Sequence, residues 1–402
     1  MAQTPATESE RNHEIECLRA VAVLMTCFSH LTWLLPFHVL TLNRIYGIYD
    51  AWSGVDLFFC ISGYVVSRSL FPQFEEIARN AALDPLQRRA RGWIVAQAFW
   101  IRRIYRLMPS AWLWLAVGIA CSAGFNTTNV FHSLQANLHS ALAAITMMAN
   151  LASLHDNLLR PNQIYWSLSL EEQFYFMLPL FLLVTPGPWR WRVLLLLIAA
   201  QFFVERHIHA ASFGAAAFVF RIDALLWGIL IHLFSQTPHY RRWQPLFLGN
   251  MRGVAVAFNL LLFGLLGALA AQVDTLPIAT GLIAIVAAVL VLLASYEANY
   301  VGGVAWLKPA LVWIGERSYA IYLIHAPVYR FCIEAGTRLA AASGRMLDET
   351  GTAPLLLAAL GLTLLLAEAN HRWIETPLRR RGAARAARRL ARVEPAANPI
   401  AA

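Results

Sequence analysis

The sequence predicts an all-α polytopic membrane protein with about ten transmembrane helices and one interfacial or re-entrant helix. Two observations lead to this prediction. Apolar residues make up 58% of the 402-residue chain and charged residues only 14%, which leaves too little polar surface for an ordinary soluble globule. Apolar segments close to the length that spans a bilayer also recur along almost the whole chain.

Eleven apolar segments are candidate transmembrane helices, since a span needs roughly 20 mostly apolar residues. They are 15–35, 53–71, 107–124, 134–153, 166–184, 190–206, 218–235, 254–271, 276–295, 312–334 and 353–371. With the N-terminus in the cytoplasm, the linker after the second segment places the eight arginines from Arg68 to Arg106 inside. This orientation satisfies the positive-inside rule. If all eleven segments crossed, the basic C-terminal end and several basic loops would lie outside.

Segment 134–153 is the one that we predict does not cross. It contains polar residues, among them Asn137, His139 and Ser140, and has no basic anchor at either end. As an outer interfacial or re-entrant helix, it leaves ten spans with both termini in the cytoplasm and most Lys and Arg residues inside.

The chain divides into a cytoplasmic segment (1–14), a transmembrane domain (15–377) and a basic cytoplasmic tail (378–402). The tail holds seven arginines from Arg379 to Arg392. This pattern predicts an amphipathic basic helix or a disordered arm on anionic lipid, or simply an orientation signal. Because the arginines cluster at segment ends, the net charge of +9 indicates membrane lipids rather than nucleic acid as the partner. The five cysteines have no metal-ligand spacing, so no metal site is predicted.

The first apolar segment carries two ionisable residues, Arg19 and His30, eleven positions apart. On a helix this spacing puts both on one face, about 16 Å apart along the axis. Ionisable groups within the bilayer indicate a functional site. The alternative is a snorkelling arginine and a packed histidine. Asp56 opens the second segment at the outer level of His30, where it could orient the imidazole as a general base or merely complement the helix dipole.

A second acidic motif opens the segment at 166–184. Glu171 and Glu172 enter from the outer side, at the level of Asp56, between Trp166 and Tyr175. The aromatic rings would suit a sugar, or they would form an interfacial belt.

Arg103 and Arg106 precede the third segment and share one helical face. Together with Arg19 they would hold phosphate groups at the inner side, because guanidinium groups match phosphate oxygens. Alternatively they only anchor the helix.

Two later motifs place further polar residues inside apolar segments. Arg221 and Asp223 are too close in sequence to pair on one helix, so we expect each to pair with a residue of another helix. Tyr322 and His325 share one face of the segment 312–334. Packing of a polar core is the alternative for both motifs.

Together and in this order, the motifs resemble the acyltransferase-3 family of bacterial integral-membrane O-acyltransferases, from Ile15 to Arg380. They are the Arg-x10-His helix (Arg19, His30), GVDLFF-x-x-SG (Gly54 to Gly63), RR-x-x-R-x-x-P (Arg102 to Pro109), WSL-x-x-E-x-QFY (Trp166 to Tyr175), R-x-D (Arg221, Asp223), SY-x-x-YL-x-H (Ser318 to His325) and E-x-P (Glu375, Pro377). No single block is specific, but the ordered set is. Some larger members carry an additional esterase-like domain, whereas this chain resembles the membrane core alone.

The resemblance implies a location in the bacterial cytoplasmic (inner) membrane and transfer of an acyl group, most often acetyl from acetyl-CoA, to a hydroxyl of a carbohydrate or glycolipid. It places the family's glutamate on Glu171. With it we assign catalytic roles to His30, Asp56 and Glu171, and binding of the acyl-CoA donor to Arg19, Arg103 and Arg106. Substrate binding is assigned to the remaining motif residues: Trp166, Tyr175, Arg221, Asp223, Tyr322 and His325. His30 would act as a general base or as a transient acyl carrier, with Asp56 or Glu171 orienting its ring.

The main rival hypothesis is a proton-coupled transporter or a lipid-linked sugar flippase without covalent chemistry. No pair of interrupted helices recurs in two halves of the sequence, which disfavours a transporter built from inverted repeats. A purely structural subunit would leave the clustered ionisable residues unexplained.

Overall fold

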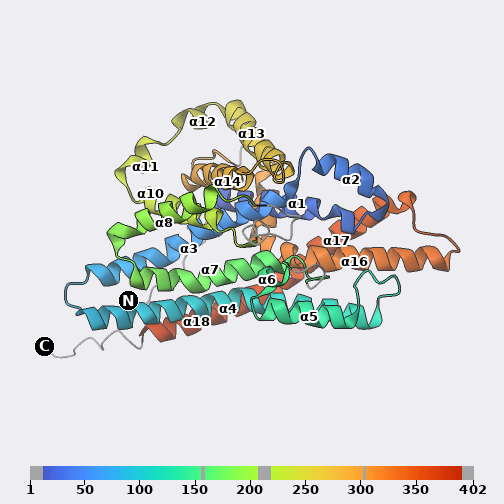
Figure 1. Cartoon of the computed structure of the whole chain (residues 1–402), viewed down its shortest axis with the longest axis horizontal. Coiled ribbons are helices and arrows are strands. Elements are labelled where there is room, and N and C mark those ends of the chain that lie inside the picture. The colour runs from blue at the N-terminus through green and yellow to red at the C-terminus, as the bar shows by residue number, and fades with distance from the viewer. Residues whose placement is uncertain (1–11, 155–158, 207–218, 302–304, 392–402) are drawn as a thin grey trace.

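A computed structural model describes residues 12–154, 159–206, 219–301 and 305–391 of the chain (Figure 1). These residues form helices joined by turns, with no strand among them, which confirms the predicted all-α class. Most of the predicted segment 1–14, as well as residues 392–402 of the tail, lies outside the described residues.

The α-helices, in chain order, vary greatly in length. They are α1 (His13–Ser29), α2 (Val39–Tyr46), α3 (Gly54–Arg79), α4 (Pro85–Gly124), α5 (Leu134–Ile145), α6 (Ala149–Ala152), α7 (Tyr165–Val184), α8 (Gly187–Phe202), α10 (Asp223–Ser235), α11 (Pro238–Arg242), α12 (Leu246–Asn250), α13 (Arg252–Ala271), α14 (Ala279–Ser295), α15 (Lys308–Glu316), α16 (Ser318–Ala342), α17 (Thr352–Asn370) and α18 (Thr376–Ala391).

Five helical stretches of the described chain are long and apolar enough to cross a membrane. They are Ala51–Arg79, Pro85–Gly124, Tyr165–Val184, Arg252–Ala271 and Glu349–Ala391. Two shorter apolar helices, α10 and α14, stand beside them. These stretches support the predicted class of membrane protein, while the count of ten spans stays a prediction.

Several of the predicted segments are not continuous helices. The segment 15–35 is helical only to Ser29, and two short 3-10 turns then lead through Pro36. Proline lacks the N–H that would continue the ladder and restricts the residue before it. The segment 312–334 is divided at Arg317 into α15 and α16.

Segment 134–153 also consists of two helices, α5 and α6, rather than one. The 12 residues of α5 extend about 18 Å, which is less than the roughly 30 Å hydrocarbon core of a bilayer. Met147 follows with a positive φ of 59° and ends the run. A short, interrupted helix agrees with the expectation that this segment does not cross.

The central helices are held together by backbone contacts at glycines. A Cβ atom on Gly63 of α3 would lie 2.1 Å from the Leu225 carbonyl oxygen of α10, and one on Gly228 of α10 would lie 2.2 Å from the Cys60 carbonyl oxygen. In membranes, small residues let helices approach in this way. A Cβ atom on Gly315 would similarly lie 2.0 Å from the Glu16 carbonyl oxygen, so α15 lies directly against α1.

The basic tail continues the last membrane-length stretch as a helix. A π-helical turn, His371–Glu375, joins α17 to α18, and α18 packs along α4 (Figure 1). Arg389 donates to the Gln97 side-chain oxygen at 2.7 and 2.9 Å, and Arg385 donates to the Tyr105 hydroxyl. The prediction of a disordered arm is therefore wrong for the part of the tail up to Ala391. This part is the helix α18, and it packs against α4.

Candidate active site

His30 pairs with a second histidine, His325 of α16. His30 follows the last residue of α1, and its Nδ1 lies 2.9 Å from Nε2 of His325. The rings are nearly parallel, with centroids 5.1 Å apart, and the Trp33 ring stacks on His30 at 4.0 Å. His325 is fully buried and His30 only partly. The sequence placed both residues in the candidate site but did not indicate that they touch.

The hydrogen bonds determine which nitrogen of each ring carries the proton. Nδ1 of His325 lies 3.3 Å from the Ile321 carbonyl oxygen, which can only accept. His325 therefore carries its proton on Nδ1 and accepts at Nε2 from the Nδ1–H of His30. Nε2 of a neutral His30 is then left with a lone pair, which is the state a general base requires.

Asp56 has a different partner from the one we expected. Its carboxylate accepts from Nε and Nη2 of Arg221 at 2.8 and 3.2 Å, and both side chains are about 1% exposed. The expectation that Asp56 orients His30 is wrong, because the carboxylate is already bound by a bidentate guanidinium that is buried with it. The Arg221 guanidinium is further enclosed by Trp52 and Trp166, whose ring centroids lie 5.0 and 4.7 Å away.

Asp223 pairs with Arg206, which follows α8, at 2.9 Å, and both are buried. The prediction that Arg221 and Asp223 each bind a residue of another segment is thus confirmed. Arg206, the last residue of the predicted segment 190–206, is only 2% exposed. The carboxylate of Asp223 accounts for this burial, because a paired arginine tolerates an apolar surrounding.

Glu171 also has partners other than His30. It accepts from the Ser62 hydroxyl of α3 at 2.5 Å and from the Tyr175 hydroxyl one turn further along α7. Arg103 lies over the Tyr175 ring at 4.8 Å. The predicted contact of Glu171 with His30 is wrong, because α7 turns this carboxylate towards the arginines. Glu172 is also buried but does not line the pocket of the arginines. Its Oε1 has no hydrogen-bond partner in the described structure.

The predicted aromatic wall for a sugar is occupied by arginines. One ring face of Trp166 holds Arg221, and the Tyr175 ring holds Arg103. Both aromatic residues therefore enclose charged groups of the protein, a packing that the sequence pattern did not reveal.

Arg19, Arg103 and Arg106 do come together, around a pocket with two compartments. The deeper compartment, about 90 Å³ in volume, is lined by all three arginines and also by Ser62, Glu171 and Tyr322. The wider compartment, about 360 Å³, shares Arg19 and Arg106 with it. It reaches Asn12, so it extends to the N-terminal end of α1.

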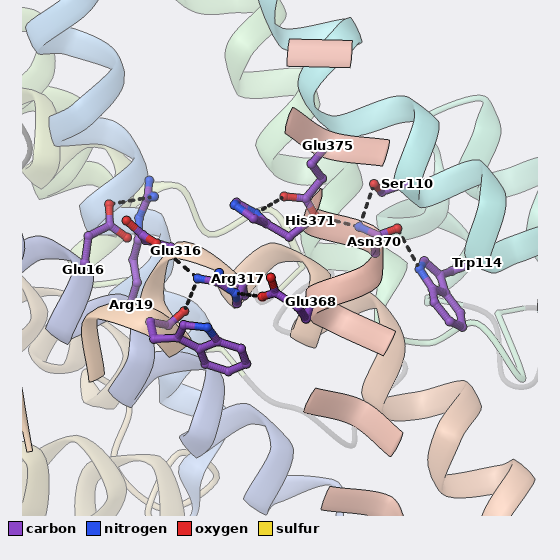
Figure 2. A network of polar contacts seen from close by, with 11 residues as sticks. Glu16, Arg19, Ser110, Trp114, Glu316, Arg317, Glu368, Asn370, His371 and Glu375 are labelled. Atoms are coloured by element: carbon purple, nitrogen blue, oxygen red, sulfur yellow. Dashed lines mark hydrogen bonds and ion pairs between the residues drawn. The ribbon is translucent and has the colours of Figure 1, made fainter. Parts of the chain in front are cut away.

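The wider compartment adds residues that the sequence assigned no role. Arg68, His371, Glu375 and Arg379 line it together with Glu316. Glu375 of the E-x-P motif lies 3.3 Å from Nδ1 of His371 and accepts from Asn370 at 2.8 Å. Figure 2 shows this network and also the Arg19–Glu16 pair, in which Nη1 of Arg19 lies 3.5 Å from Oε1 of Glu16. The four arginines of the wider compartment (Arg19, Arg68, Arg106 and Arg379) outnumber its three glutamates (Glu16, Glu316 and Glu375) by one, and this excess of positive charge favours an anionic ligand.

Tyr322 connects the deeper compartment to the histidine pair. It lines that compartment, its hydroxyl binds Ser167 at 2.5 Å and donates to the Ile164 carbonyl at 2.7 Å, and its ring lies 5.9 Å from His325. Because residues 322 and 325 are about one turn apart, the pocket ends one turn of α16 before the pair.

Fold and site define the class: a helical membrane protein in which an arginine-lined pocket ends one turn of α16 before a histidine pair. The chain belongs to the family described as the acyltransferase domain, whose sequence profile matches residues 12–367. This match confirms the family that the ordered motifs indicated.

Curated relatives are similar over 92% of this chain. A peptidoglycan O-acetyltransferase of Listeria monocytogenes is 27% identical, with 56% of its own length covered. A putative O-acetyltransferase of Staphylococcus aureus and a putative peptidoglycan O-acetyltransferase of Bacillus subtilis are each 25% identical, with 57% and 55% covered. The chain therefore spans little more than half the length of these relatives. No solved structure matches the chain.

Proposed function

We propose that this protein transfers an acetyl group from acetyl-CoA to a hydroxyl of a carbohydrate or glycoconjugate. The observation that carries the proposal is the arginine-lined pocket that ends at Tyr322, one turn of α16 before the His30–His325 pair. The relatives are named as O-acetyltransferases, two of them for peptidoglycan, which supports a cell-envelope polysaccharide or glycolipid as the acceptor.

The arginines are suited to the donor. Arg19 and Arg106 lie where the two compartments meet, and Arg68 and Arg379 line the wider one. Guanidinium groups at these positions would bind the phosphates of acetyl-CoA, while the pantetheine arm extends past Arg103 towards Tyr322.

The histidine pair supplies the proton chemistry. His30 Nε2 takes the proton of the acceptor hydroxyl as the oxygen attacks the thioester carbonyl carbon. The tetrahedral oxyanion then collapses, the carbon–sulfur bond breaks, and the thiolate of CoA receives the proton from His30. His325 keeps His30 in the required tautomer. The route in which His30 itself briefly carries the acetyl group uses the same nitrogen.

Asp56 and Glu171 support this chemistry without touching His30. Asp56 fixes Arg221 between two indole rings, and Glu171 fixes Ser62 and Tyr175 in the pocket wall. We therefore assign both carboxylates to positioning of the site.

We also propose the orientation in the membrane. Ten spans in the bacterial cytoplasmic membrane, with both termini inside, would open the pocket at the N-terminal end of α1 towards cytoplasmic acetyl-CoA. The histidine pair would then lie nearer the outer surface, where an envelope acceptor arrives.

The test is acetyl transfer by the purified protein in lipid nanodiscs, with radiolabelled acetyl-CoA and isolated peptidoglycan as the acceptor. We expect label in the glycan with wild type and its loss in His30→Ala. His139→Ala is the matched control, because His139 is exposed on α5. Thioester that stays intact with every polysaccharide tried would refute the proposal and favour transport.

A further inference from the structure

Arg330 is a buried cation on the side of the histidine pair away from the arginine-lined pocket. Along α16 it lies five residues, or about 7.5 Å, beyond His325, whereas Tyr322 lies on the other side. Its guanidinium stands 5.0 Å from the centroid of the Trp33 ring, which also stacks on His30. The side chain is thus connected to the transfer site through one indole.

Within the described chain, no carboxylate pairs with this arginine. It is only 8% exposed. The nearest acidic residue along the helix, Glu334, is bound by other groups. Glu334 accepts from the backbone and hydroxyl groups of Thr127 and Thr128 and from Arg338 at 2.8 Å. A buried charge without a counter-ion is costly, so its retention indicates a ligand that completes the pair.

A small cavity adjoins Arg330 and contains a second unsatisfied polar group. Asn137 of α5 is fully buried, and its side-chain Oδ1 has no hydrogen-bond partner in the described structure. Asn137, Asn162 and Arg330 line this cavity, whose volume of about 10 Å³ admits a group of about water size but no sugar ring. The cavity therefore has room for one oxygen atom of a substituent, with the rest of the molecule outside it. Asn137 Oδ1 is an acceptor, so its partner there would be a donor such as a hydroxyl.

We propose that Arg330 binds an anionic substituent, a carboxylate or a phosphate, of the carbohydrate acceptor. The inference rests on the proposed function. Acetyl-CoA would occupy the arginine-lined pocket on the Tyr322 side, so the group that meets Arg330 belongs to the molecule approaching from the other side. A ring held by its anionic substituent at Arg330 would place a neighbouring hydroxyl towards His30. The protein would then select acidic sugars over neutral ones.

The experiment compares three acceptors that differ at one carbon: octyl β-glucoside, octyl β-glucuronide and the 6-phosphate of octyl β-glucoside. Each is incubated with radiolabelled acetyl-CoA and protein in nanodiscs, alongside isolated peptidoglycan. For wild type we expect kcat/KM about ten- to a hundredfold higher for at least one acidic glycoside than for the neutral one, as for a charge-assisted hydrogen bond. The two acidic compounds distinguish carboxylate from phosphate.

Substitution of the arginine separates binding from a structural role. Arg330→Met should erase the preference for the acidic acceptor, and Arg330→Lys should restore part of it. Arg345→Met, which removes an exposed arginine after α16, should leave the preference at the wild-type value. Hydrolysis of acetyl-CoA in the absence of acceptor shows whether a variant still binds the donor and is still folded.

Each outcome decides the question. A wild-type protein that acetylates the glucoside as well as both acidic glycosides overturns the inference and leaves the proposed function intact. An Arg330→Met variant that loses activity on all acceptors and hydrolysis in equal proportion also overturns it, because a structural defect explains that result. Absence of label in every acceptor, peptidoglycan included, refutes the proposed function itself.

Discussion

His325 gives the sharpest test of the site, because its effect on catalysis should differ from its effect on donor binding. Its Nε2 accepts the Nδ1–H of His30 at 2.9 Å, and this bond leaves Nε2 of His30 free to act as a base. His325→Ala removes that acceptor. His30 can then adopt the other tautomer, with the proton on Nε2, or rotate away from the acceptor hydroxyl.

The size of the loss follows from two contributions. A neutral hydrogen bond is worth about 0.5–1.5 kcal/mol, or roughly a two- to tenfold change in rate. Loss of the correct tautomer removes part of the general-base contribution as well, which is typically about 10²–10⁴-fold. We therefore expect kcat of His325→Ala to fall by more than about tenfold and by at most about 10⁴-fold.

Matched measurements distinguish positioning from packing. His325→Gln should recover part of kcat, because its amide oxygen can accept the His30 Nδ1–H. The KM for acetyl-CoA should stay close to wild type in both variants, since the arginines bind the phosphates. Thermal unfolding in detergent identifies variants that have lost the fold. If His325→Ala retained wild-type kcat, or if Gln were no better than Ala at equal stability, the tautomer assignment would be wrong.

Three further predictions concern Arg106, Asp56 and the orientation in the membrane. Arg106→Ala should raise the KM for acetyl-CoA about ten- to a hundredfold by removing a charge-assisted contact, and unchanged donor kinetics would make Arg106 an anchor only. Asp56→Asn removes the carboxylate charge that pairs with buried Arg221 and should lower the free energy of unfolding by about 3–5 kcal/mol. Thermal melting measures this loss, and an unchanged melting temperature would contradict the pair's structural importance. In a cysteine-free background, a cysteine at Asn129 should react with an impermeant thiol reagent on intact cells and one at Gln244 only after permeabilisation, whereas the reverse pattern would invert the proposed orientation.

Apolar segments predicted the helical class and the position of most long helices, because burial in lipid or protein selects apolar residues wherever the helix lies. They did not predict where helices end. The first segment stays apolar past Ser29, yet the helix stops there, and Pro36 was the available signal. The break at Arg317 has no comparable signal.

Site residues were predicted as a set, but their partners were not. Arg221 and Asp223 had to pair outside their own helix, and that could be deduced from the cost of a buried charge. The choice of Asp56 for Arg221, and of His325 for His30, depends on how helices distant in sequence rotate against each other. The sequence predicted Asp56 and Glu171 at the depth of His30. Depth alone does not define which side chains meet.

The buried Asp56–Arg221 pair has a consequence for biogenesis. Its two residues are 165 positions apart in the chain. At a synthesis rate of about 5–20 residues per second, Arg221 emerges roughly 8–33 s after Asp56.

During that interval the carboxylate of Asp56 has no guanidinium to neutralise it, and hydrocarbon is a costly surrounding for the charge. We therefore expect α3 to stay in a hydrated or protein-lined place, such as the insertion machinery, until Arg221 is made. On this reasoning, α3 enters the lipid only after the synthesis of Arg221.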